Sequence, residues 1–172
     1  MKITKNDLIS AIKSLSNTEI IESPLDDTDK FTAFKKNGSL FILDSEESFD
    51  QIERKNFSLE FIYQSKKIIP SDNYELTALR IANRINIESN SIPIVTYRDE
   101  SKVFVITAKH ILFTEGISIL EDPIKAVSKK YLAIAILTMM TTILTTVQKL
   151  ESEISKLVSN NVDDGEALEE EN

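Results

Sequence analysis

Large apolar residues occupy every second position over residues 57–63, a pattern that predicts a half-buried β-strand. Earlier in the chain, residues 31–36 and 40–44 flank the dipeptide Asn37-Gly38. Because Asn-Gly tolerates the positive φ angles of a type I′ turn, this segment predicts a β-hairpin. Three antiparallel strands are therefore expected in the first half of the chain.

Helical periodicity and turn residues divide the chain around these strands. A first helix is predicted near residues 5–16, and Pro70-Ser71-Asp72 is expected to open a second. Residues 92–97 and 102–108 are rich in Val, Ile, Phe and Tyr, so they predict a second hairpin. The second helix is expected to pack through one face, formed by Leu76, Ala78, Leu79, Ala82, Asn83 and Ile85.

A much longer helix is predicted from Glu121-Asp122-Pro123 to about Ser159, because acids and proline suit a first turn and no helix breaker follows. About 35 helical residues extend about 50 Å, more than is needed to cover a sheet of this size. The second half repeats apolar residues at alternating steps of four and three, a heptad seam that is expected to meet another polypeptide. The seam consists of Ile136, Met140, Ile143, Val147, Leu150, Ile154 and Leu157.

The net charge of -8 is concentrated at the C-terminal end of the chain. Six acidic residues follow residue 162, whereas residues 1–162 carry 22 acidic and 20 basic side chains. Residues 159–172 are therefore expected to form an acidic, disordered tail. The nearly neutral remainder lacks the basic stripe that binds phosphates, so nucleic acid is not an expected partner.

Few residues carry recognisable chemistry. The chain has no cysteine, one histidine and three glycines, which excludes thiolate metal sites, paired-histidine zinc motifs and glycine-rich phosphate loops. We expect no metal, cofactor, small-molecule substrate or enzymatic activity. His110 lies at the end of a predicted strand without an accompanying nucleophile motif, so we expect it to be solvated or bonded to the backbone.

The long helix contains 18 consecutive uncharged residues, 131–148, about the length that spans a bilayer. Five threonines fall largely on one side of this segment and favour a packed or partly solvated helix over a membrane span: Thr138, Thr141, Thr142, Thr145 and Thr146. The chain also begins without the apolar stretch of a signal peptide. A cytoplasmic protein is expected, with no membrane partner.

Asn83 and Asn86 are three residues apart on one face of the second predicted helix, and Asn86 lies near its end. Asparagine at such a position caps a helix or adopts the left-handed conformation, which fixes how the chain turns into the next strand. We expect a structural role for both residues rather than ligand binding.

Three segments of the chain, taken in order, resemble the YbjN-like family of bacterial proteins, which is labelled a sensory transduction regulator family. They are residues 57–63, the segment from Ala82-Asn83 through Asn86 to Ser89, and residues 97–105. The resemblance covers about residues 5–135. It implies a two-layer α+β fold of order α-β-β-β-α-β-β-α, similar to class I type III secretion chaperones, with an antiparallel sheet, no catalytic residues and usually a dimer.

The resemblance and the residue pattern together predict three consecutive parts. Residues 1–135 form the YbjN-like α+β domain, residues 136–158 extend the C-terminal helix with its seam, and residues 159–172 form the tail. The expected function is a non-enzymatic protein-binding adaptor or chaperone-like regulator that acts as a homodimer. The alternatives are a structural or assembly protein that oligomerises through the C-terminal helix, and a type III secretion chaperone for an effector.

Overall fold

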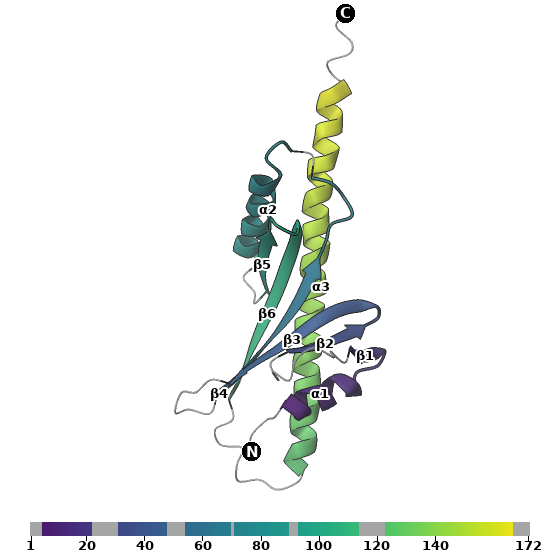
Figure 1. The fold of residues 1–172 in the computed structure, drawn as a ribbon, viewed down its shortest axis with the longest axis vertical. Helices are drawn as coiled ribbons and strands as arrows, with labels where there is room; N and C mark the ends of the chain where they lie inside the picture. Colours follow the sequence, from purple (N-terminus) through teal and green to yellow (C-terminus); the bar gives the residue numbers. More distant parts are fainter. Residues whose placement is uncertain are drawn as a thin grey trace, which may run out of the picture. The chain divides into compact units, whose positions relative to one another are not determined.

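The computed structural model describes residues 5–21, 31–47, 54–69, 71–89, 93–113 and 123–166. Along these residues, runs of consecutive strands lie between the helices (Figure 1). The elements are α1 (Lys5–Ser14), β1 (Thr18–Ile21), β2 (Phe31–Lys36), β3 (Ser39–Glu47), β4 (Arg54–Tyr63), α2 (Tyr74–Glu88), β5 (Pro93–Arg98), β6 (Val103–Phe113) and α3 (Pro123–Glu166).

The strands form one six-stranded antiparallel sheet in the order β1-β2-β3-β4-β6-β5. The α+β class, the antiparallel sheet and the long C-terminal helix are therefore confirmed. The expectation of five strands was wrong, because β1 pairs with β2 from Thr18 opposite Lys36 to Ile21 opposite Ala33. Four residues are too few to show the alternation on which strand prediction depends. The similarity to secretion chaperones stays a prediction.

The hairpin of β2 and β3 confirms the signal of its Asn-Gly turn. Asn37 and Gly38 have φ angles of 50° and 81°, the left-handed values that the two central residues of a type I′ turn require. The strands then pair from Lys36 opposite Ser39 to Phe31 opposite Asp44. This tight turn fixes the register that places Phe34 opposite Phe41.

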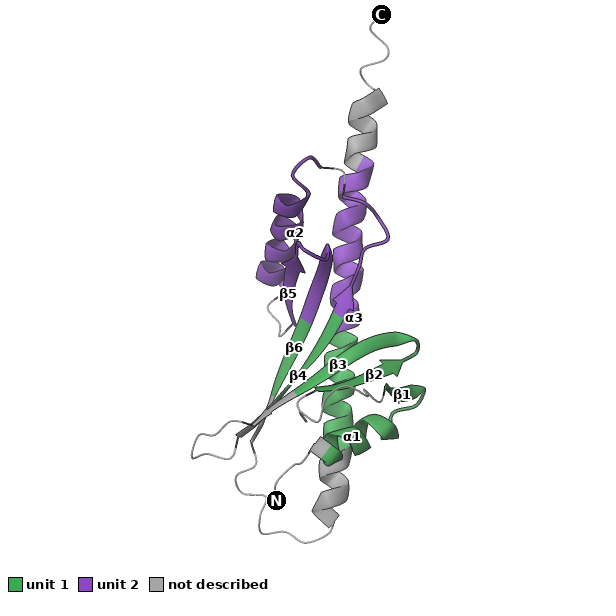
Figure 2. Ribbon diagram, in the orientation of Figure 1, with its two compact units in different colours: residues 1–61, 107–142 green, residues 62–106, 143–172 purple. Residues whose placement is uncertain are grey.

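The chain divides into two compact units whose segments interleave along the sequence (Figure 2). Unit 1 contains residues 1–61 and 107–142, and unit 2 contains residues 62–106 and 143–172. Helix α3 contributes to both units, whereas the three parts expected from the sequence follow one another. Of the expected acidic tail, residues 167–172 lie outside the described residues, and the preceding residues to Glu166 belong to α3.

The core of unit 1 is built around aromatic side chains of its strands. The Phe34 and Phe41 rings are stacked with centroids 5.6 Å apart, and Phe61 of β4 lies 5.1 Å from Phe41. Each fully buried side chain of this size stabilises the fold by about 1.5–3 kcal/mol relative to an exposed one. The buried residues also come from both helices of the unit, and they include Leu8, Ala11, Ile12, Leu43, Phe57, Leu59, Leu132, Ile136 and Met140.

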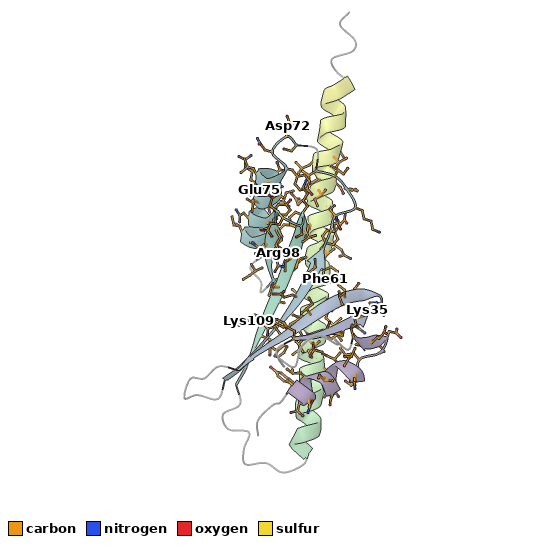
Figure 3. All side chains as sticks on the ribbon, in the orientation of Figure 1. Lys35, Phe61, Asp72, Glu75, Arg98 and Lys109 are labelled. Atoms are coloured by element: carbon orange, nitrogen blue, oxygen red, sulfur yellow. The ribbon has the colours of Figure 1, made fainter. Side chains whose placement is uncertain are left out.

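Unit 2 packs α2 beside strand β5 (Figure 1). In Figure 3, Glu75 marks the first turn of α2 and Arg98 the last residue of β5. The predicted packing face of α2 was wrong in part, because Leu76, Leu79 and Asn83 are exposed. The buried face is rotated around the helix and consists of Ala78, Ile81, Ala82 and Ile85, which share the core with Val95, Phe104, Ile106, Ile143, Leu150 and Ile154.

Candidate functional site

His110 lies on β6 in unit 1 and contacts two aromatic side chains. Its Nε2 atom is 3.0 Å from the Tyr131 hydroxyl of α3, and its ring centroid is 5.3 Å from that of Phe57. Partial burial lowers the pKa of His110 below its ordinary value of 6.5. Either tautomer of the neutral ring can form the bond to Tyr131. The partly buried histidine therefore joins β6 to α3 through a contact with a tyrosine hydroxyl, which was not expected from the sequence.

The described residues offer no metal centre. Within the described ranges, no three or more His, Asp or Glu side chains come together in a way that would hold an ion. In unit 2, charged side chains of α2 and α3 instead form contacts between opposite charges. Their arrangement is that of a helix-to-helix contact.

Glu153 of α3 is the centre of this charged contact. It forms an ion pair with Arg84 of α2, and it accepts a hydrogen bond of 2.6 Å from Lys156 one turn further along α3. The Lys156 hydrogen bond and the charges of Arg84 and Lys156 hold the pKa of Glu153 below its ordinary value, against the opposing effect of burial. A second polar contact of α3 is made by Lys67, which donates to Ser155 Oγ at 2.6 Å. These contacts fix α3 within unit 2.

The two asparagines singled out from the sequence lie in different surroundings. Asn86 is partly buried, and its side-chain amide bonds to both backbone groups of Val95 on β5, each at 2.8 Å. Asn83 is exposed on α2. The end of α2 is closed instead by the backbone of Ser89, whose N–H donates to the Ile85 carbonyl. Asn86 thus contacts the following strand and does not cap its own helix.

The predicted heptad seam faces the interior of the chain. Five of its members, Ile136, Met140, Ile143, Leu150 and Ile154, are at most 2% exposed, and Val147 and Leu157 are half-buried. Leu132, Ala135, Met139 and Thr146 are buried beside them, so the buried face is wider than a coiled-coil seam. Because these side chains already contact the chain's own core, we place the candidate contact surface on the opposite side of α3.

That opposite side carries a continuous set of exposed, uncharged residues, which we call the outer stripe. Its apolar members are Ile134, Leu137 and Leu144 and, at the edge where the hydroxyl contacts His110 of β6, Tyr131; all four are 40–54% exposed. Three exposed threonines belong to the same stripe, two between Leu137 and Leu144 and one directly after Leu144: Thr138, Thr141 and Thr145. At about 100° per residue, all seven lie within about 140° of arc.

Two threonines of this surface, Thr138 and Thr141, direct their hydroxyl hydrogens into the helix. Thr138 Oγ1 donates to the Ile134 carbonyl at 2.9 Å, and Thr141 Oγ1 donates to the Leu137 carbonyl at 2.9 Å. Such bonds to the carbonyl four residues earlier satisfy the donor inside the helix. Each threonine also adds a methyl group, so the outer stripe is less polar than its composition indicates.

The sequence held a signal for this stripe in the charge-free segment 131–148 and the clustering of its threonines on one side. Periodicity alone pointed to the seam, because the seam is the more hydrophobic face. Of the described helices, the one that includes Lys130–Ser159 is long and apolar enough to cross a membrane by length and composition. In the most apolar 18-residue stretch of this helix, 39% of the residues are buried within the chain. Core helices of folded domains can be equally long and apolar.

Comparison of the chain with protein-family models, with curated proteins and with solved structures finds no match in any of the three.

Proposed function

We propose that this chain is a non-enzymatic adaptor or chaperone-like regulator that works through contact with another polypeptide and acts as a homodimer. The observation that carries the proposal is the outer stripe of α3. Four large apolar side chains are exposed there on a helix face without charge over 18 residues. Contiguous exposed apolar surface of this kind is typical of interaction sites, whereas single exposed apolar residues are ordinary.

The surroundings of the stripe support a protein as the bound molecule. Regularly spaced apolar side chains on one helix face are the usual form of helix recognition by another polypeptide. The ion pair of Arg84 with Glu153 serves packing between two helices of the chain itself. The resemblance of residues 5–135 to the YbjN-like family supports the same proposal, because that family is similar to secretion chaperones and has no catalytic residues.

A photo-reactive residue in place of Ile134 tests the proposal in the cells that make the protein. The expected result is a discrete cross-linked product between the full chain and a polypeptide, identified by mass spectrometry. The product should disappear when Leu137→Ser is added, because this change removes apolar contact from the same face. A photo-reactive residue in place of Ile87, which is 79% exposed on α2, is the matched control and should not give this product.

Absence of any protein product at position 134, or a product unaffected by Leu137→Ser, would overturn the proposal. The assembly-protein alternative is favoured by the position of the stripe on the C-terminal helix itself. It predicts a ladder of products containing three or more copies of the chain. An adaptor instead gives one product of fixed composition, and a secretion chaperone gives a product with its effector.

Truncation of α3 from Ile136 onward cannot separate these functions. Ile136 and Ile143 are fully buried, so truncation would remove core side chains from the fold. Point substitutions on the exposed face avoid this difficulty, because a substitution of an exposed side chain usually changes the free energy of unfolding by about 0.5 kcal/mol or less.

A further inference from the structure

We infer that the outer stripe of α3 is covered by the same stripe of a second copy of this chain, with the two helices antiparallel and a two-fold axis near Thr141. The inference rests on the proposed function and names the polypeptide that occupies its contact surface. It follows from the spacing of the exposed residues and from the charges that border the two ends of the stripe.

The exposed positions of α3 are nearly symmetric about Thr141. In an antiparallel pair centred there, residue numbers of facing positions add to 282. Ile134 is then level with Gln148, and Thr141 faces its own copy. Leu137 of one copy lies beside Leu144 of the other, because both are about 40–60° to the same side of Thr141, and Thr138 lies beside Thr145 on the other side in the same way; all of these residues are exposed.

This pairing puts the leucines of the two copies together on one flank and the threonines together on the other, with the small side chain of Thr141 at the centre. The leucine flank supplies apolar contact between the copies, and the small side chains of the threonine flank let the two helices approach closely. The back-bonded hydroxyls of Thr138 and Thr141 need no partner across such a contact, so burying them leaves no donor unsatisfied.

The charges that border the stripe select the antiparallel direction. Exposed Lys130 precedes the stripe and half-buried Glu151 follows it, about 32 Å further along the helix and about 60° around it. In the antiparallel pair, position 130 of one copy lies level with position 152 of the other, one residue from Glu151. Around the helix, Lys130 lies about 20° and Glu151 about 80° to the same side of Thr141, so Lys130 of each copy can reach Glu151 of the other.

The opposite flank is complementary in the same way. Tyr131 and Lys149 are 18 residues apart, which is five full turns, so they share one angular position on α3. The antiparallel pair brings Lys149 of one copy within one turn of Tyr131 of the other, and a lysine beside a tyrosine ring is a favourable contact. A parallel pair would instead place Lys130 against Lys130 and Lys149 against Lys149, and like charges in contact are unfavourable.

The same charges favour a second copy over a lipid surface. A membrane that received the stripe would attract Lys130 and Lys149 to its phosphates, but it would offer no positive partner for Glu151 except the choline of a zwitterionic lipid. The two-fold arrangement uses the Lys130–Glu151 contact twice and covers the apolar side chains between the two contacts.

Sedimentation equilibrium of the purified full chain tests the inference. The wild type should sediment as a dimer. Lys130→Glu and Glu151→Lys each create like-charge contacts at both ends of the stripe and should weaken the dimer on the order of tenfold at low salt. The double variant Lys130→Glu/Glu151→Lys should restore the wild-type dissociation constant, because opposite charges face each other again.

Matched variants separate these contacts from effects of net charge. Lys66→Glu changes the net charge as Lys130→Glu does, and Glu88→Lys changes it as Glu151→Lys does. Lys66 and Glu88 are exposed outside α3, so both variants should keep the wild-type dissociation constant.

Two further variants separate the stripe from the rest of the surface. Ile134→Lys should give a monomer, because it places a charge inside the contact. Ile87→Lys introduces the same change at an exposed isoleucine of α2 and should leave the dimer intact. Circular dichroism of each variant should match the wild type, since the substituted side chains are exposed or, at Glu151, half-buried.

Three results would overturn the inference: a monomeric wild type, a double variant that stays as weak as the single ones, or a monomer that floats with phosphatidylcholine and phosphatidylglycerol vesicles. A monomer in solution together with a cross-link from position 134 to a different polypeptide would refute the second copy and leave the contact with a polypeptide standing. A monomer without any cross-link would refute both.

Discussion

The side-chain amide of Asn86 makes to Val95 the two hydrogen bonds that a neighbouring strand would make. The amide nitrogen donates to the Val95 carbonyl, and the amide oxygen accepts from the Val95 N–H, each at 2.8 Å. β5 is the last strand in the sheet order, so one of its edges has no neighbouring strand within the described sheet. Asn86 therefore closes this edge at Val95, a position where exposed backbone groups would otherwise invite pairing with another chain.

Replacing Asn86 by Leu should destabilise the protein by about 2 kcal/mol, because a leucine of similar size leaves the Val95 N–H and carbonyl without partners. Urea unfolding followed by circular dichroism measures the change in free energy of unfolding. The variant should also aggregate more readily, since its sheet edge is open.

Asn83→Leu is the matched control for this prediction. It makes the same substitution three residues earlier on α2, at an exposed position. Its effect on the free energy of unfolding should be about 0.5 kcal/mol or less. Equal effects of the two substitutions would show that the Val95 hydrogen bonds do not stabilise the fold.

The two faces of α3 should respond differently to the same truncation. Ile136→Ala should cost about 2–5 kcal/mol, because Ile136 is fully buried and alanine leaves a cavity. Ile134→Ala, only two residues away, should cost about 0.5 kcal/mol or less in a monomeric sample, because Ile134 is 54% exposed. Urea unfolding at low protein concentration compares them. A larger loss for Ile134→Ala would reverse our assignment of the buried face.

His110 should make the stability of the protein depend on pH. Burial lowers its pKa in the folded chain below 6.5, so below that pH the unfolded chain binds more protons than the folded one. The effect of His110 on the free energy of unfolding is therefore most favourable above pH 6.5, and the free energy of unfolding falls as the pH drops below 6.5. His110→Gln cannot take up the proton, so this part of the pH dependence should be missing from the variant.

Tyr131→Phe is the control for the histidine. It removes the hydroxyl that contacts Nε2 and leaves the ring of His110 in place. Since burial is the cause of the lowered pKa, this variant should keep the pH dependence. If His110→Gln and the wild type lose stability in parallel below pH 6.5, the histidine does not titrate differently on folding.

Glu153 should make the stability of the protein depend on pH in the acidic range. Its pKa is lowered by the hydrogen bond from Lys156 and by Arg84, so its contribution is present above the ordinary value of 4.5 and is lost as the pH falls through the folded-state value. At neutral pH, Glu153→Gln should cost about 1 kcal/mol, the range of a hydrogen-bonded ion pair near the surface. Thermal unfolding of the wild type and of Glu153→Gln at a series of pH values measures both effects.

Glu88→Gln is the control for Glu153. It makes the same change at an exposed glutamate, the last residue of α2, and should have little effect on the free energy of unfolding. Comparable losses from the two glutamates would mean that the Arg84 contact between α2 and α3 adds no stability.

Local rules predicted the elements of the fold well where a few neighbouring residues decide the outcome. Asn37 and Gly38 alone require a tight turn, and the alternation after Phe57 gives β4 its buried face. The four-residue strand β1 was missed, because its existence depends on hydrogen bonds to β2 and not on its own pattern. The packing face of α2 was misplaced for a similar reason, since Leu76 is as apolar as the buried Ile81.

The sequence by itself determined that α3 is long, two-faced and free of charge over residues 131–148, because periodicity and composition are properties of consecutive residues. Only the tertiary structure decided which face is available. It buries Ile136 and Ile143 against the chain's own core and leaves Ile134 and Leu137 exposed. Burial depends on contacts between residues distant in sequence, and no local pattern states which of two apolar faces those contacts will cover.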